Sequence, residues 1–200
     1  RLFLGGQAYK GSIMLKDREL SSLSDNERIN LVSYMGHDAS LMTASIYENI
    51  TLGDDGDVLP ALHAVCFDED LASMRDGIQT LVGNGGMRLS GGQQERIALA
   101  RTLYHKKPVM ILDDPFASVD ASTEYQILSN MRTFCADCAV ILVSHRLSQF
   151  SKLDGILLLD ENGNTAFSTH ENLMKTSPVY RKLYEFQQGT VSSADSEVSK

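Results

Sequence analysis

Residues Leu89, Ser90, Gly91, Gly92 and Gln93 have the types and spacing of an anion site at the start of a helix. Apolar residues recur at helical spacing over residues 94–103, so Ser90 stands at the expected helix N-cap. The first N–H groups of a helix have no internal partner, and the helix dipole places partial positive charge there. The two glycines allow a ligand to approach the backbone closely. The stretch predicts a phosphate site, although a plain Gly-rich turn before an ordinary helix explains these five residues equally well.

A second candidate site lies at the end of an apolar segment. Residues 108–112 are typical of a short buried strand, and the carboxylates of Asp113 and Asp114 follow it directly. A strand that delivers acids at its carboxyl end is how P-loop nucleotidases hold magnesium. Asp113 is therefore a candidate Mg²⁺ ligand.

Two further motifs follow in order. They are Ala117, Ser118, Val119 and Asp120, and then an apolar run at 140–143, which is typical of a second buried strand and leads to Ser144 and His145. The order and spacing of all four motifs resemble the nucleotide-binding domain of ATP-binding-cassette (ABC) transporters. The resemblance makes residues 89–93 the signature motif, Asp113 the Walker B aspartate, residues 117–120 the D-loop and His145 the switch histidine.

The resemblance implies an α/β fold with a P-loop NTPase (RecA-like) core and a helical ABC subdomain at about residues 43–88. The domain would span residues 1–188, and the small, polar and acidic residues 189–200 are expected to be disordered. The implied cofactors are ATP and Mg²⁺. The implied catalytic residues are Asp114 and His145, and the implied nucleotide contacts are the signature residues, His37 and Asp120.

Three positions depart from the family pattern. After a strand expected at 31–35, the family has Pro-Gln, but Gly36 and His37 stand here. A histidine could still hydrogen-bond or ligate in place of the glutamine, and a surface histidine without a role is the alternative. In the loop before the signature, Asn84 replaces a glutamate that normally faces the coupling helices of the membrane domain.

The third departure is Asp114, since family members that hydrolyse ATP well have glutamate as the general base there. Aspartate keeps the carboxylate but shortens the side chain by one methylene, about 1.5 Å. A misplacement of about 1 Å can reduce a rate roughly 100-fold. We therefore expect Asp114 to be a weak base.

Other elements follow from local patterns. We expect a strand at 12–15, a helix after the capping box of Ser24 and Glu27, and a helix capped by Asp57 with Pro60 in its first turn. We also expect helices at 69–74, at 121–134 capped by Asp120, after Thr169 and at 178–187, and a hairpin at 155–167. The helical spacing predicts that Leu62, Val65, Leu71 and Met74 are buried. We interpret Met74 and Met87 as core or interface filler rather than as ligands.

No Gly-x-x-x-x-Gly-Lys-Ser/Thr motif occurs in the 200 residues. In the family this P-loop precedes the segment that residues 1–6 resemble, so we expect a truncated domain that begins partway through its first helix. Such a domain would leave uncovered the side of the sheet that carries Val109, Ile111, Ile141 and Val143. An unpaired apolar edge promotes association.

Composition limits the remaining choices. A net charge of −8 and a pI near 5.0 argue against nucleic-acid binding, which needs a basic face. No apolar run approaches a membrane span, and no signal peptide is visible, so we expect a soluble chain at the cytoplasmic face of the cell membrane. The cysteines Cys66, Cys135 and Cys138 suit a reducing compartment and form no disulfide framework; we expect structural roles for the last two.

The implied function is ATP-driven transport, in which two such domains enclose two nucleotides and drive attached membrane domains. An intact signature beside Asp114 and His37 fits the less catalytic half of a heterodimer. The expected partners are a second nucleotide-binding domain in a different subunit and a transmembrane domain upstream in the same polypeptide. The alternatives are a non-hydrolysing, nucleotide-dependent regulatory module and a soluble ABC ATPase. The 200 residues alone are expected to be inactive.

Overall fold

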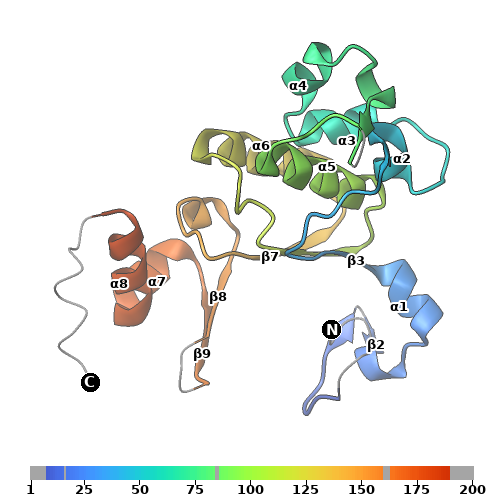
Figure 1. Cartoon of the computed structure of the whole chain (residues 1–200). Helices are drawn as coiled ribbons and strands as arrows, with labels where there is room; N and C mark the ends of the chain where they lie inside the picture. Colours follow the sequence, from blue (N-terminus) through green and yellow to red (C-terminus); the bar gives the residue numbers. More distant parts are fainter. Residues whose placement is uncertain (1–7, 16, 84–85, 160–162, 190–200) are drawn as a thin grey trace. The chain divides into compact units, whose positions relative to one another are not determined.

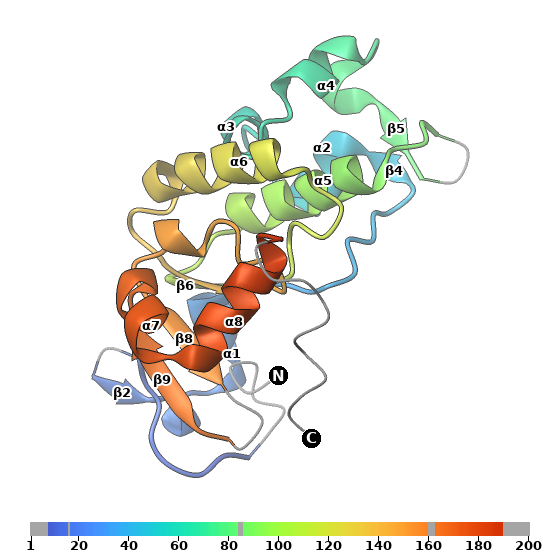
Figure 2. The same ribbon diagram turned by 90° about the vertical axis from the view of Figure 1, so that its left-hand side faces the viewer.

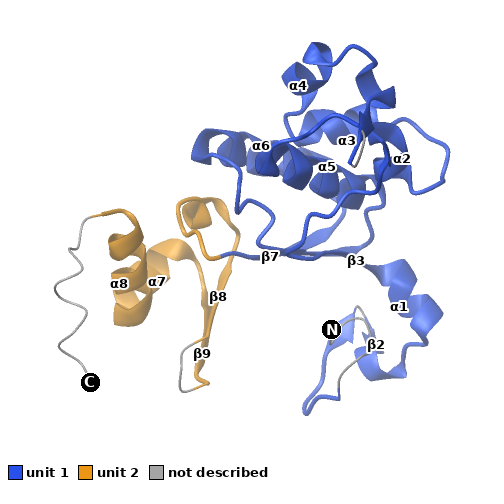
Figure 3. Cartoon of the chain, viewed as in Figure 1, with its two compact units in different colours: residues 1–144 blue, residues 145–200 orange. Residues whose placement is uncertain are grey.

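The computed structural model describes residues 8–15, 17–83, 86–159 and 163–189. The chain forms two compact units, residues 1–144 and 145–200, shown in different colours in Figure 3. Among the described residues, no helix is both long enough and apolar enough to cross a lipid bilayer. Asn84 and the expected C-terminal tail at 190–200 lie outside the described residues.

A parallel sheet of three strands forms the centre of the first unit. Its order is β3–β6–β7, with β3 at Val32–Met35, β6 at Val109–Asp113 and β7 at Ala139–Val143. Tyr34 is in register with Ile111, and Asp113 is in register with Val143. Because the strands are parallel, the residues that follow β3 and β6 emerge at the same edge of the sheet.

Two long helices, α5 at Gly91–Tyr104 and α6 at Ala121–Phe134, lie on one face of this sheet (Figures 1 and 2). The apolar spacing that predicted α5 is confirmed, since Ile97, Leu99 and Leu103 are fully buried. They belong to one hydrophobic cluster with Met110 and Leu112 of β6 and Ile127 of α6. The helices thus hold the carboxyl end of β6 in place.

The β7 strand is not buried as the apolar run 140–143 predicted. Val140, Ile141 and Val143 are 39%, 41% and 48% exposed. The central strand β6 has a neighbour on each side, whereas β7 pairs with β6 alone among the described residues. The expected uncovered side is therefore present at β7, while Val109 and Ile111 of β6 are half-buried.

Short helices occupy the region in which the helical subdomain is expected, although that domain boundary stays a prediction. The elements are β4 (Ala44–Ser45), α2 (Ile46–Thr51), α3 (Leu59–Ala64), α4 (Asp68–Ser73), the 3-10 helix η2 (Gly77–Gln79) and β5 (Leu81–Val82). β4 and β5 pair antiparallel. Leu62, Val65 and Met74 are buried as predicted, but Leu71 is only half-buried.

The cap predicted at Asp57 is wrong by one residue. Val58 is the N-cap of α3, with a proline in the first turn as expected. The Asp57 carboxylate still accepts a hydrogen bond from the Leu59 N–H at 2.9 Å. Asp57 therefore stabilises the start of α3 from the residue that precedes the N-cap.

The first elements along the chain are shorter than expected. The predicted strand 12–15 reduces to β1 at Met14–Leu15, which pairs antiparallel with β2 at Arg18–Glu19. A 3-10 helix η1 at Leu20–Ser22 leads to α1 at Asp25–Leu31. Its capping box of Ser24 and Glu27 is confirmed.

The second unit contains a hairpin and two helices. The 3-10 helix η3 (Phe150–Lys152) precedes β8 (Ile156–Leu159), β9 (Thr165–Ser168), α7 (His170–Thr176) and α8 (Pro178–Gln187). The predicted hairpin is confirmed by the antiparallel pairing of β8 and β9, and Thr169 caps α7 as predicted. Ile156, Leu173 and Tyr180 form its buried cluster.

Candidate functional site

The helix α5 begins at a complete capping box. Ser90 has an extended backbone, with φ −66° and ψ 162°, and its hydroxyl accepts a hydrogen bond from the Gln93 N–H at 3.2 Å. The Gln93 side-chain oxygen accepts one in return from the Ser90 N–H at 2.9 Å. The predicted N-cap is confirmed, and it exposes the positive end of a helix of 14 residues.

The glycines that follow Ser90 pack against the loop 117–120. A Cβ atom on Gly92 would lie 2.8 Å from the backbone oxygen of Ser118, and one on Gly91 would lie 3.1 Å from its Oγ atom. The two glycines were expected to let a ligand approach the backbone closely. In the structure, it is the loop residue Ser118 that approaches them. The loop after the two carboxylates therefore reaches the first turn of α5.

In that loop, Asp120 has a local partner. Its carboxylate accepts hydrogen bonds from the N–H groups of Ser122 and Thr123, each at 3.0 Å, and so caps α6. Hydrogen bonding, first of all from the Thr123 side chain, lowers the pKa of Asp120. The predicted cap is confirmed, and the nucleotide contact of Asp120 stays a prediction.

The two acidic residues lie at the carboxyl end of β6, as the apolar strand predicts. The Tyr34 hydroxyl of β3 donates to Asp113 Oδ2 at 3.2 Å. Asp114 has a left-handed backbone, with φ +51°, and its N–H donates to the Val143 carbonyl at 2.8 Å. A non-glycine residue at positive φ is uncommon and often marks a functional position.

The Asp114 carboxylate is largely buried. Its side chain is 12% exposed, and its Oδ1 atom has no hydrogen-bond partner among the described residues. A buried oxygen of this kind is costly unless a ligand or another polar group meets it. Asp114 thus presents an unused acceptor beside Asp113.

The donor set fits magnesium only together with a nucleotide. In the part of the chain that the structure describes, no three His, Cys, Asp or Glu residues form a group that could hold a metal ion. Mg²⁺ is commonly bound by one or two carboxylates, with substrate phosphates and water as the other ligands. Asp113 supplies such a carboxylate and leaves the remaining positions to phosphate oxygens and water.

His37 lies in the loop after β3, beside Asp114, which directly follows β6. Its Nδ1 atom is 3.9 Å from Asp114 Oδ2, too long for a hydrogen bond, and its side chain is 68% exposed. The two residues meet because β3 and β6 are adjacent and parallel. His37 therefore stands next to the candidate base, and its contact with a nucleotide stays a prediction.

Comparison with known proteins identifies the family of the chain. Residues 1–117 match the protein family described as ABC transporter. The chain belongs to the ABC transporter family. It is similar to a Rickettsia bellii protein named as an export ATP-binding/permease protein, with 33% identity over 88% of this chain and 31% of the relative. It is also similar to an ATP-dependent lipid A-core flippase of Burkholderia thailandensis, with 32% identity over 88% of this chain and 30% of the relative.

The fold agrees with that of a solved exporter. The structure of a bacterial Atm1-family ABC exporter with ATP bound superposes with a TM-score of 0.84 and 28% sequence identity. The match covers 94% of this chain and 34% of the exporter chain. The nucleotide-binding domain fold of ABC transporters, a P-loop NTPase fold, is thereby confirmed. The chain spans about a third of the length of the relatives it matches.

Within this ABC transporter domain, the signature helix has an anchor that the sequence did not reveal. Asp70 of α4 accepts a hydrogen bond from Gln93 Nε2 at 2.7 Å and forms an ion pair with Arg96 at 2.7 Å. Arg96 also donates to the Cys66 carbonyl at 2.7 Å. Arg96 follows the motif closely and could have been suspected, whereas no signal near Asp70 links it to residues 93–96.

The switch residue His145 is the first residue of the second unit. It is exposed, and its carbonyl accepts a hydrogen bond from Gln187 Nε2 of α8 at 2.7 Å. The contact of His145 with a nucleotide stays a prediction.

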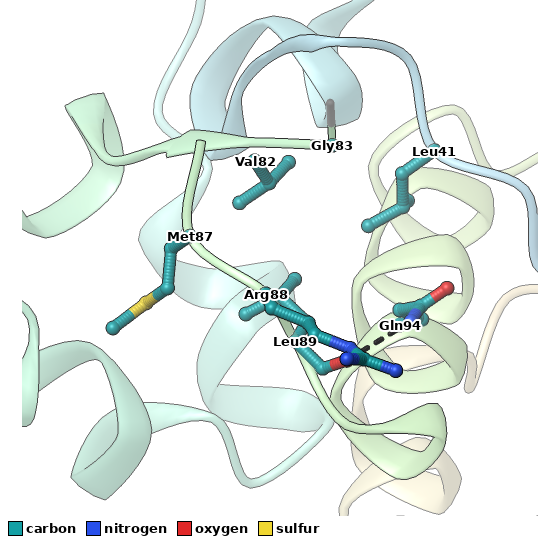
Figure 4. Close-up of a pocket in the computed structure, with 7 residues that line it drawn as sticks. All are labelled: Leu41, Val82, Gly83, Met87, Arg88, Leu89 and Gln94. Carbon is teal, nitrogen blue, oxygen red and sulfur yellow. Dashed lines mark hydrogen bonds between the residues drawn. The ribbon is translucent and has the colours of Figure 1, made fainter. Parts of the chain in front are cut away.

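A cavity of about 340 Å³ lies beside the start of α5 (Figure 4). It is lined by Leu41, Val82, Gly83, Met87, Arg88, Leu89 and Gln94. Gln94 Nε2 donates to the Leu89 carbonyl at 3.0 Å, which ties the signature to its own helix. Met87 is 45% exposed and lines this cavity, so it belongs to a surface rather than to the core.

Proposed function

We propose that this chain is the ATP-binding and ATP-hydrolysing part of an ABC exporter. One observation carries the proposal: the loop that follows Asp113 and Asp114 returns to the first turn of the signature helix through Ser118. The metal-binding end of one strand and the anion-binding end of one helix are thereby held in a single framework. The named export functions of the relatives support the link to transport.

Each residue of the framework has a proposed task. Asp113 would hold Mg²⁺ together with the phosphate oxygens of ATP. The metal ion, when bound, would neutralise charge that develops on the transferred phosphoryl group. Asp114 would orient the attacking water and accept its proton, since its buried Oδ1 atom has an open lone pair. Because aspartate is shorter than glutamate, this step would be slow.

The signature residues would act on a second nucleotide. Ser90 and Gly91 are exposed at the positive end of α5 and would meet the γ-phosphate held by a second nucleotide-binding domain. Catalysis of phosphoryl transfer rests mainly on positioning and electrostatic stabilisation, so donors from this helix would contribute without covalent chemistry.

The two sites would therefore be unequal. Asp114 and His37 weaken the site that this chain contributes with its own acids, whereas the signature that completes the other site is intact. We infer that the chain is the less catalytic half of a heterodimer, joined to a different subunit. A transmembrane domain upstream in the same polypeptide would place it at the cytoplasmic face of a membrane.

Steady-state ATP turnover of a complete transporter that carries this chain tests the proposal. Gly91→Asp adds charge and bulk at the phosphate site and should remove most of the turnover. Asp114→Asn should change turnover little, and Asp114→Glu should raise it. Asp17→Asn is the matched control, because Asp17 is exposed and lies far in sequence from both Gly91 and Asp114. Equal damage by Asp114→Asn and Gly91→Asp would contradict the asymmetric role.

A regulatory module that binds ATP without hydrolysis is the second candidate, favoured by the short carboxylate of Asp114. It predicts that Asp114→Glu leaves turnover unchanged even with a consensus partner domain. The same measurement therefore separates the two functions.

A further inference from the structure

Glu95 is a buried carboxylate of α5 to which none of the roles above assigns a task. It is 8% exposed, and both of its oxygens accept from one donor, the Ser118 N–H, at 3.0 and 2.8 Å. A buried carboxylate is costly unless it is hydrogen-bonded, and this one lies near the positive end of a helix. The Ser118 N–H therefore supplies the partner that Glu95 requires.

The same peptide segment is held from a second side. The Ser118 carbonyl lies against Gly92, where a Cβ atom would come within 2.8 Å of its oxygen. Two residues later, Asp120 is fixed as the cap of α6. The loop 117–120 is thus clamped between two helices, and the side chain of Glu95 in the signature helix bonds directly to the loop backbone.

We propose that Glu95 is a positioning residue that locks the loop 117–120 to the signature helix, so that the two move as one body. The inference rests on the proposed function, because it matters when Ser90 and Gly91 approach a nucleotide on a second domain. If the loop left the helix, Glu95 would retain a buried charge without its donor. Separation of the loop 117–120 from helix α5 is therefore disfavoured. A displacement of residues 89–93 would then move the loop 117–120 with them.

Amide hydrogen exchange, measured residue by residue by NMR on the 200-residue chain, tests the lock directly. Glu95→Leu keeps a side chain of similar size but removes the acceptor, and Glu95→Ala is a second variant in case the first misfolds. Both should speed exchange of the Ser118 amide at least tenfold while the amides of residues 97–103 remain protected. Glu95→Gln retains an acceptor oxygen and should restore protection. Glu69→Ala, an exposed acidic residue of α4, is the control.

The lock is refuted if Ser118 exchange is unchanged in Glu95→Leu and Glu95→Ala, or rises equally in Glu95→Gln. In a complete transporter, Glu95→Leu should lower kcat at least fivefold with KM unchanged, and Glu95→Gln should restore it. Faster Ser118 exchange with unchanged kcat would also overturn the inference. A normal turnover of Gly91→Asp would instead refute the proposed function, and the exchange result would still stand by itself.

Discussion

Ser90 combines two tasks that substitution can separate, because it caps α5 and stands at the proposed phosphate site. Ser90→Ala removes the oxygen that accepts the Gln93 N–H at 3.2 Å, while the return bond from the Ser90 N–H to Gln93 survives. Loss of a serine cap costs about 0.5–2 kcal/mol. Since one of the two bonds remains and the other is long, we expect the lower half of that range. This corresponds to a fall in Tm of roughly 1–5 °C for a chain of this size.

Ser90→Asp keeps a capping oxygen and adds a negative charge at the helix start. Its free energy of unfolding, measured by denaturant titration of the chain, should stay within about 0.5 kcal/mol of the unsubstituted chain. In a complete transporter, the same charge should repel phosphate and reduce ATP turnover at least tenfold. Ser90→Ala should therefore lose stability, whereas Ser90→Asp should keep its stability and lose turnover.

Ser24 provides the matched control, because it forms the same kind of capping box with Glu27 at the start of α1. Ser24→Ala should lower stability to a similar degree and leave turnover unchanged. The reasoning fails at the cap if Ser90→Asp is less stable than Ser90→Ala. It fails at the phosphate site if Ser90→Asp hydrolyses ATP at the normal rate.

Three further outcomes are expected. The 200-residue chain, which has no P-loop sequence, should show no ATP binding by calorimetry; micromolar binding with Mg²⁺ would contradict this. The exposed side chains of β7 should bind a hydrophobic dye, and Ile141→Lys should reduce that signal; equal dye binding by both chains would oppose the idea. The ion pair with Arg18 holds the pKa of Glu27 at about 2, below its ordinary 4.5, so its stabilisation of α1 is present above pH 4.5 and lost toward pH 2. The protection factors of the α1 amides, which are corrected for the intrinsic pH dependence of exchange, should fall over this range, and Glu27→Gln should reduce that fall.

Much of the local structure follows from the sequence alone. The caps at Ser24, Ser90, Asp120 and Thr169 were all predictable, because each joins a side chain to a backbone N–H two or three residues later. The strand β6 with its terminal carboxylates follows from a short apolar run. Where such patterns failed, as at Asp57, the error was one residue in the start of a helix.

The contacts that organise the site depend on the tertiary structure. Glu95 meets Ser118 across 23 positions, and Tyr34 meets Asp113 across 79. The spacing of apolar residues in the sequence does not predict such pairs, because they form only when helix α5 packs over the sheet and β3 pairs with β6. The exposure of β7 is decided in the same way. An apolar run predicts that a strand forms, but its burial depends on which elements cover it. Residue types at a fixed offset determine bonds within one turn of a helix, whereas bonds between elements depend on how those elements pack.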